Sequence, residues 1–146
     1  MRRLLGSNDV TTISAKHEGG DRFSISVRGH TVMVDQPQDH GGDDSAPTPT
    51  ELFVAGLVGC QGFFARRFLA RHGLTDQELD LEARFEMAPS APSRVTAIVT
   101  EIRLRRELAP EIEAGLRRSV ERCTVHNSIV QAPDIEVRFT TAPVPG

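Results

Sequence analysis

Alternation of apolar and polar residues at the start of the chain predicts a small antiparallel sheet. Residues 10–14 (VTTIS) are typical of a strand, residues 16–21 (KHEGGD) of a turn, and residues 22–28 (RFSISVR) alternate between apolar and polar side chains. Residues 31–35 (TVMVD) continue the period of two after a Gly-His turn. We therefore expect a three-stranded meander, followed by a loop rich in Gly, Asp and Pro over residues 36–47.

Residues 48–73 predict one long helix whose two ends are both specified. Thr48 and Glu51, with a proline between them, fit a capping box, in which each residue satisfies a free backbone amide of the other. Gly73 suits the left-handed residue that commonly follows a helix. The middle of the helix, residues 52–64, is apolar or small on almost every face, which predicts burial on all sides at the centre of the fold.

Three glycines, at positions 56, 59 and 62, interrupt this apolar helix. Each costs about 1 kcal/mol relative to alanine. We therefore expect another helix or a second chain to pack closely against them and offset that cost.

The second half of the chain predicts a hairpin, a second helix and a closing strand. Residues 79–87 and 94–104 alternate as two strands, and an apolar stripe ending at Cys123 predicts a helix that begins at Pro110. Residues 134–140 (DIEVRFT) alternate again and predict the last strand. The order βββ-α-ββ-α-β predicts an α+β protein with antiparallel sheets around buried helices, in a single domain spanning residues 1–146.

Composition narrows the classes of function. The 146 residues include 17 basic and 20 acidic side chains, mixed along the sequence, for a net charge of -3. No basic stripe or polybasic cluster indicates nucleic acid or an anionic membrane as a partner. The first ten residues hold only two adjacent leucines, too few for a signal peptide or a membrane span, so we expect a cytoplasmic protein.

The two cysteines, Cys60 and Cys123, are the candidate chemistry. A permanent disulfide is not expected in a reducing compartment, and free cysteine is commonly a small buried packing residue. The other interpretation is a peroxidatic and resolving pair, in which one thiolate reduces a peroxide, becomes a sulfenic acid and is captured by the second thiol. Such a pair needs a cation or hydrogen bonds to favour the first thiolate.

The contexts of the two cysteines resemble the OsmC/Ohr family, the osmotically inducible and organic hydroperoxide resistance proteins. The resemblance lies in GGDDSAPTPTELFVAGLVGC, which ends at Cys60, and in RCTVHNSI, which contains Cys123. It implies an OsmC-like α+β fold in an intertwined homodimer with two long helices at its centre. It also implies a thiol peroxidase without a bound cofactor, with Cys60 peroxidatic, Cys123 resolving, organic hydroperoxides as substrates, and a dithiol such as a lipoyl protein as reductant.

Two features depart from the pattern of the hydroperoxide reductases. The glutamate expected immediately after the helix proline is replaced by Thr50, and Glu51 comes one residue later, turned by about 100° around the helix. The arginine expected beside the thiolate has two candidates: Arg22 in a Gly-Gly-Asp-Arg context, and Arg28 before a Gly-His turn. Glu51, Arg22 and Arg28 are thus the candidate activating residues, each with a structural interpretation beside the functional one.

Three other functions stay open from the sequence. The first is a non-catalytic homodimer that binds a small apolar or acyl ligand beside Cys60, which the change at Thr50 favours. The second is a thiol stress sensor. The third is a zinc site built from Cys60, Cys123, His126 and His72, for which a single Cys-x-x-His is the only closely spaced pair.

Overall fold

A computed structural model describes residues 5–6 and 9–141 of the chain and begins with a three-stranded antiparallel meander. Strand β1 (Ser14–Gly19) pairs with β2 (Arg22–Val27), which pairs with β3 (His30–Val34). Gly19, the last residue of β1, and Gly20 in the turn that follows both have positive φ. Most of the N-terminal stretch used to argue against a leader segment lies outside the described residues.

The register of β1 corrects the first expected strand. Pairing begins at Ser14 and continues to Gly19, so Lys16 and His17, expected in the turn, are strand residues. The physical reason is that Gly19 and Gly20 adopt positive φ without steric cost, which shortens the turn to the residues just before Arg22. Residues 10–13, expected as the strand, precede β1 and are not part of the sheet.

A loop with one 3₁₀ turn, η1 (Gln38–His40), leads into the long helix α1 (Pro49–Arg71). The capping box forms as expected, with Thr48 as the N-cap, and Gly73 follows the helix with a φ of 70°. Helix α1 then connects to an antiparallel hairpin of β4 (Leu79–Met87) and β5 (Val95–Leu104). Helices α2 (Pro110–Val120) and α3 (Thr124–Val130) complete the regular structure.

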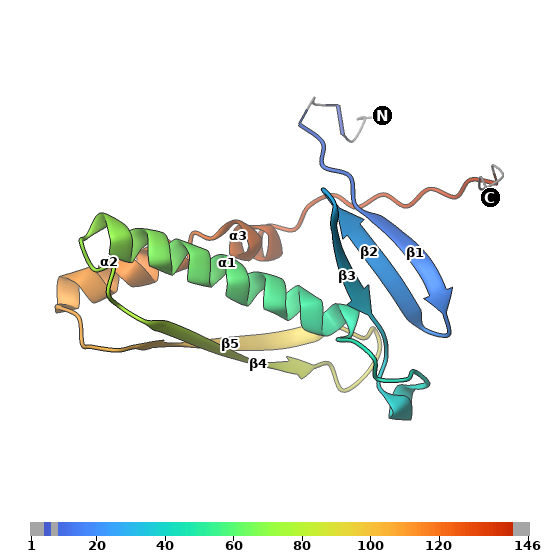
Figure 1. Cartoon of the computed structure of the whole chain (residues 1–146), viewed down its shortest axis with the longest axis horizontal. Coiled ribbons are helices and arrows are strands. Elements are labelled where there is room, and N and C mark those ends of the chain that lie inside the picture. The colour runs from blue at the N-terminus through green and yellow to red at the C-terminus, as the bar shows by residue number, and fades with distance from the viewer. Residues whose placement is uncertain (1–4, 7–8, 142–146) are drawn as a thin grey trace.

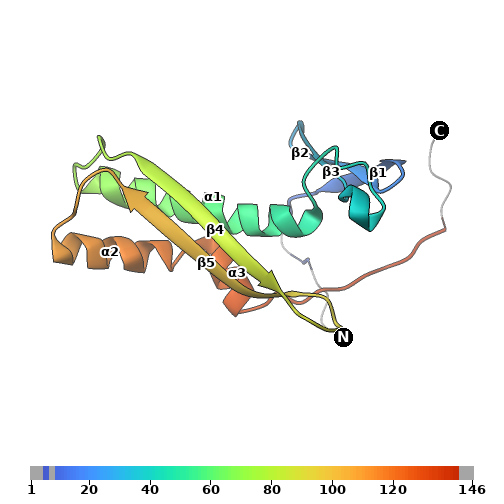
Figure 2. The same cartoon turned by 90° about the horizontal axis from the view of Figure 1, so that it is seen from below.

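Helix α1 is the centre of the arrangement (Figure 1). It contacts α2 and α3 alongside it and the β4–β5 hairpin that runs across α1 and α2, whereas the β1–β3 sheet lies beside its N-terminal end (Figures 1 and 2). The buried core joins the C-terminal half of α1 to α2 through Ala65, Phe68, Leu69, Leu116 and Val120. By length and mean hydropathy alone α1 could cross a membrane, a test that the central helix of a globular domain also meets.

The α+β class, the antiparallel sheets and the OsmC-like fold are confirmed, and the expected order of elements holds as far as α2. Helix α3 corrects the expectation of a single helix ending at Cys123, because Cys123 is the N-cap of this further helix. The closing strand expected over residues 134–140 is not a strand in this chain. A strand requires an edge with free amides and carbonyls, and this extended segment pairs with none of the described strands.

Burial of α1 on all sides is also not observed within one chain. Phe53 and Phe63 are 45% and 51% exposed, and an added Cβ at Gly56 or Gly59 would meet nothing within 4 Å. Only the side of α1 that faces the hairpin and α2 is packed, because one chain supplies covering elements for that side alone. Residues 52–64 therefore carry more apolar surface than this single chain buries.

Candidate functional site

Helix α1 fixes the position of the first thiol. Cys60 is the twelfth residue of the helix, about 16 Å along the axis from Pro49. The residues of α1 that lie on its sheet-facing side are buried, whereas Cys60 is half-buried on the side that meets α3. The thiol thus belongs to the most regular and best-specified element of the chain.

The second thiol sits between two helices. Cys123 is the N-cap of α3, and its Sγ accepts a hydrogen bond of 3.3 Å from the backbone amide of His126. The side chain is completely buried. Burial raises the pKa of the Cys123 thiol above its ordinary value, and the amide hydrogen bonds from His126 and Val125 oppose this only in part.

The two thiols are neighbours across the contact of α1 with α3. The neighbouring Cys60 further raises the pKa of Cys123. Both cysteines are free thiols in this structure. Cys123 therefore points inward as expected, Cys60 is only half-buried, and the fold places the two residues close together.

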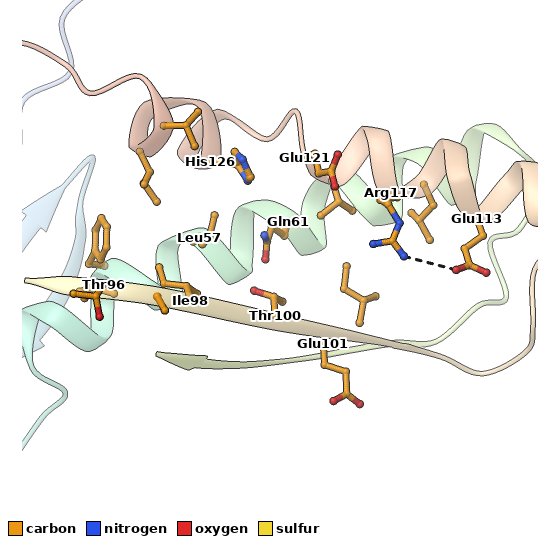
Figure 3. A pocket seen from close by; sticks show the side chains of 18 of the residues that line it. Leu57, Gln61, Thr96, Ile98, Thr100, Glu101, Glu113, Arg117, Glu121 and His126 are labelled. Atoms are coloured by element: carbon orange, nitrogen blue, oxygen red, sulfur yellow. Dashed lines mark ion pairs between the residues drawn. The ribbon is translucent and has the colours of Figure 1, made fainter. Parts of the chain in front are cut away.

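A cavity of about 700 Å³ lies next to the thiol pair, between α1, β5, α2 and α3 (Figure 3). Its walls are mainly apolar, and among its described lining residues there is no cysteine. Gln61 and His126, which adjoin the two thiols in sequence or by hydrogen bond, both line it. In Figure 3 the Gln61 side chain lies between His126 and Thr100 of β5.

Gln61 is a site residue that the sequence analysis missed. It is 8% exposed, and its Oε1 has no hydrogen-bond partner among the described residues. A buried carbonyl oxygen without a donor is costly, so this position favours an incoming N–H or O–H group. The available signal was a lone amide within an otherwise apolar helix, directly after Cys60.

Glu51 is engaged in the helix cap. Its Oε1 accepts a 2.9 Å hydrogen bond from the backbone amide of Thr48, and its own amide donates to Thr48 Oγ1 at 3.1 Å. The backbone amide of Thr48, followed by its hydroxyl, lowers the pKa of Glu51. Glu51 is exposed at the start of α1, whereas Cys60 lies in its middle, so within this chain the carboxylate is used at the helix terminus.

The two candidate arginines both belong to the β1–β3 sheet. Arg22 begins β2 and forms an ion pair with Asp43 of the loop. Arg28 occupies the turn between β2 and β3 with a φ of 48° and is exposed. Because this sheet lies beside the N-terminal end of α1 (Figure 1), a single chain does not bring either guanidinium to the middle of the helix.

The loop before α1 is held by a buried carboxylate, Asp35. Its oxygens accept hydrogen bonds from the hydroxyl and amide of Ser45 and from the amide of Gln36. These bonds, the Ser45 hydroxyl first, lower the pKa of Asp35 to about 2. A Cβ at Gly42 would lie 2.0 Å from the Gln36 carbonyl oxygen, so glycine is required there. The loop therefore delivers Thr48 to the helix start in a fixed position.

The zinc alternative receives no support from this geometry. No group of three or more His, Cys, Asp or Glu side chains able to hold a metal ion occurs among residues 5–6 and 9–141. His72 instead stacks on Phe68, and its Nδ1 lies 2.9 Å from the Phe68 carbonyl oxygen. These contacts engage the His72 side chain at the C-terminal end of α1.

Comparison with known proteins gives a consistent family and fold. The model of the family described as OsmC-like protein matches residues 42–138. A Psychrobacter arcticus 273-4 protein, described as an osmotic stress induced and detoxification response protein, superposes with a TM-score of 0.75 at 22% identity, over 85% of this chain and 91% of that chain. No curated protein sequence gives a significant match.

Two further solved structures share the fold at lower identity. The organic hydroperoxide resistance protein OsmC of Legionella pneumophila gives a TM-score of 0.63 at 20% identity, over 84% of this chain and 90% of its own. The organic hydroperoxide resistance protein OhrB of Bacillus subtilis gives 0.59 at 16% identity, over 82% and 89%.

Proposed function

This chain belongs to the OsmC-like protein family, and we propose that it is a thiol-dependent peroxidase that reduces organic hydroperoxides through Cys60 and Cys123. The observation that carries the proposal is the unequal thiol pair. The two thiols are neighbours, yet Cys123 is fully buried with a raised pKa, whereas Cys60 is half-buried. A pair in which one thiol keeps its proton beside the other suits a peroxidatic and resolving mechanism.

The reaction proceeds in three steps. The Cys60 thiolate attacks the outer oxygen of the hydroperoxide, the O–O bond breaks, and the alkoxide takes up a proton to leave as the alcohol. Cys60 is then a sulfenic acid, oxidised by two electrons. The Cys123 sulfur attacks it, forming the Cys60–Cys123 disulfide and releasing water. A dithiol reductant, for which a lipoyl protein is our candidate, reduces the disulfide and is itself oxidised to a disulfide.

The cavity beside the pair supplies room for the organic part of the peroxide. Its apolar walls suit an alkyl or aryl group, and the unpartnered Oε1 of Gln61 is an acceptor for the hydroperoxide O–H. We assign Gln61 a positioning role next to the peroxidatic Cys60. The amide is the one buried side-chain acceptor among the described residues that no protein group satisfies.

We further propose that the functional unit is a homodimer. Proteins of the OsmC/Ohr family are generally homodimers. The open face of α1 at Gly56 and Gly59, the exposed apolar side chains of the β1–β3 sheet, and the unpaired alternating segment 134–140 support this arrangement. Phe139 in that segment is 94% exposed, which is costly for an aromatic side chain in water.

The homodimer also offers a candidate for the cation beside the Cys60 thiolate, which a single chain does not bring there. Arg22 is committed to Asp43, whereas Arg28 stands in an exposed turn without an ion pair among the described residues. We therefore favour Arg28, reaching the thiolate of the other copy, over Arg22. Glu51 is assigned to the helix cap and not to the thiolate.

A non-catalytic function as a binding module for a small apolar or acyl ligand is the second candidate. The same cavity favours it, because about 700 Å³ is ample for a small organic molecule. This function requires no reactivity at Cys60. It predicts that the ligand binds equally well after Cys60→Ser.

Stopped-flow consumption of cumene hydroperoxide by the fully reduced protein distinguishes the two. We expect fast loss of the peroxide with a Cys60–Cys123 disulfide found by mass spectrometry. Cys60→Ser should abolish the reaction, and Cys123→Ser should allow one turnover that ends in a sulfenic acid at Cys60. A rate no greater than that of free cysteine would reject the peroxidase and leave the binding module.

A further inference from the structure

A second cavity, distinct from the one beside the thiols, lies between the C-terminal half of α1 and helix α2. Its volume is about 480 Å³. Phe63, Phe64 and Phe68 of α1 contribute aromatic surface to it. This aromatic lining can accept the body of an apolar molecule.

Close contact of the two helices forms the base of this cleft. A Cβ on Gly115 of α2 would lie 2.7 Å from Cζ of Phe68, so only glycine lets the phenyl ring approach α2 this closely. Phe68 is part of the buried core. The base of the cleft is therefore rigid, which suits a preformed binding site.

Four arginines line the cleft: Arg67 and Arg71 from α1, and Arg118 and Arg122 from the α2 region. Arg67 and Arg71 are spaced by four residues and lie on the same side of α1, whereas Arg118 lies in the last turn of α2 and Arg122 follows the end of that helix. None of the described residues that line the cleft is acidic, and none of the four forms an ion pair within the described part of the chain. Like charges gathered in this way repel one another.

Several arginines elsewhere in the chain do form ion pairs. Arg103 contacts both Glu82 and Glu101, and Arg105 contacts Glu78. The absence of carboxylates is therefore a property of the cleft and not of the protein as a whole, whose net charge is -3.

We propose that this cleft binds a small anionic amphiphile, that is, a carboxylate or phosphate group attached to an aliphatic or aromatic body. The guanidinium groups supply donors for the anion and the phenylalanine rings supply the apolar contact. A bound anion would also offset the mutual repulsion of the four cations. The proposal does not depend on peroxidase activity, since neither Cys60 nor Cys123 lines this cleft.

Local effects explain the positions of some single arginines, but they do not explain why four arginines line one cleft. Arg71 and Arg118 lie in the last turns of their helices, where a cation is favourable. Arg67 lies over the Phe63 ring, 4.8 Å from its centroid. Neither effect requires that four cations from two elements share one cavity without a carboxylate.

Isothermal titration calorimetry of the full-length reduced protein with octanoate tests the proposal, with 1-octanol as the uncharged match. We expect saturable binding of octanoate, weakened roughly tenfold or more by the double substitution Arg118→Gln/Arg122→Gln. The matched control, Arg84→Gln/Arg94→Gln on the β4–β5 hairpin, removes the same charge outside the cleft and should change the affinity by less than about twofold. NMR signals of the arginine Nε–H groups in the unsubstituted protein locate the site independently.

Three results would overturn the proposal. Equal binding of octanoate and octanol would show that the charge is irrelevant. Equal losses in the two double variants would show non-specific attraction. Arginine-dependent sedimentation with phosphatidylglycerol vesicles, without binding of free octanoate, would assign the cations to a lipid surface instead of a free molecule.

Discussion

Cys123, the N-cap of α3, lies beside Cys60 in the middle of α1, and this neighbour raises the pKa of Cys123. The contact makes the two thiols unequal. Burial, and then the proximity of Cys60, hold the proton on Cys123. Such inequality is what distinguishes an attacking thiol from a resolving one, and it gives the first prediction.

Cys123 should resist alkylation by iodoacetamide at neutral pH, because only the thiolate reacts and the pKa of Cys123 lies above its ordinary 9.0. Cys60→Ala removes a neighbour that raises this pKa and should therefore speed the reaction. Mass spectrometry of the labelled peptide as a function of pH measures both effects. Labelling of Cys123 at neutral pH as fast as in the unfolded chain would contradict the burial that we describe.

The same raised pKa has a consequence for stability. Folding stabilises the protonated thiol, so this contribution is complete below pH 9 and is lost as the pH rises through the higher value of the folded state. The urea-induced unfolding free energy should therefore decline above pH 9. Cys123→Ala should reduce that decline, and an unchanged slope in the variant would assign it to other groups.

Asp35 should make the protein sensitive to acid. Its pKa is lowered from 3.8 to about 2 by hydrogen bonds from Ser45 and Gln36, so its contribution to stability is complete above pH 4 and is lost as the pH falls towards 2. Asp35→Asn should shift the acid unfolding midpoint, followed by circular dichroism, and lower stability at neutral pH. Asp80→Asn on the exposed face of β4 is the control and should change neither.

Substitutions in the capping box separate structure from catalysis. Thr48→Ala removes the acceptor for the Glu51 amide and should cost about 1 kcal/mol of unfolding free energy. Glu51→Gln keeps an acceptor for the Thr48 amide, so both stability and peroxide consumption should change little. A large loss of peroxide consumption in Glu51→Gln, with the stability unchanged, would instead place Glu51 at the thiolate.

Alanine at the helix glycines tests the homodimer. Gly59 has open space around it and Gly62 has only an ordinary 3.6 Å contact with Leu81, so either change should stabilise an isolated chain by about 1 kcal/mol through helix propensity. If a second copy packs against the open face, Gly59→Ala should weaken the dimer roughly tenfold or more in sedimentation equilibrium, whereas Gly62→Ala should not. Equal behaviour of the two variants would remove Gly59 from the interface.

Local sequence patterns were sufficient to predict most of the helices and strands. Thr48, Glu51 and Gly73 placed α1 because caps and left-handed glycines are local chemistry that needs no distant partner. The alternation of apolar and polar residues predicted β2, β4 and β5, because each of these strands packs against the rest of the structure with one face. The expected strand at 134–140 failed for the opposite reason: pairing requires an edge, and alternation does not show whether the chain supplies one.

The sequence by itself determined that Cys60 lies on a long, capped, apolar helix and that Cys123 points inward. Only the tertiary structure decided that the two cysteines are neighbours, that Glu51 is engaged in the helix cap and that Arg22 pairs with Asp43. The physical reason is range. Helix caps and hydrophobic periodicity depend on residues a few positions apart. The approach of the two thiols, the burial of an amide without a partner and the clustering of four arginines depend on how distant segments pack.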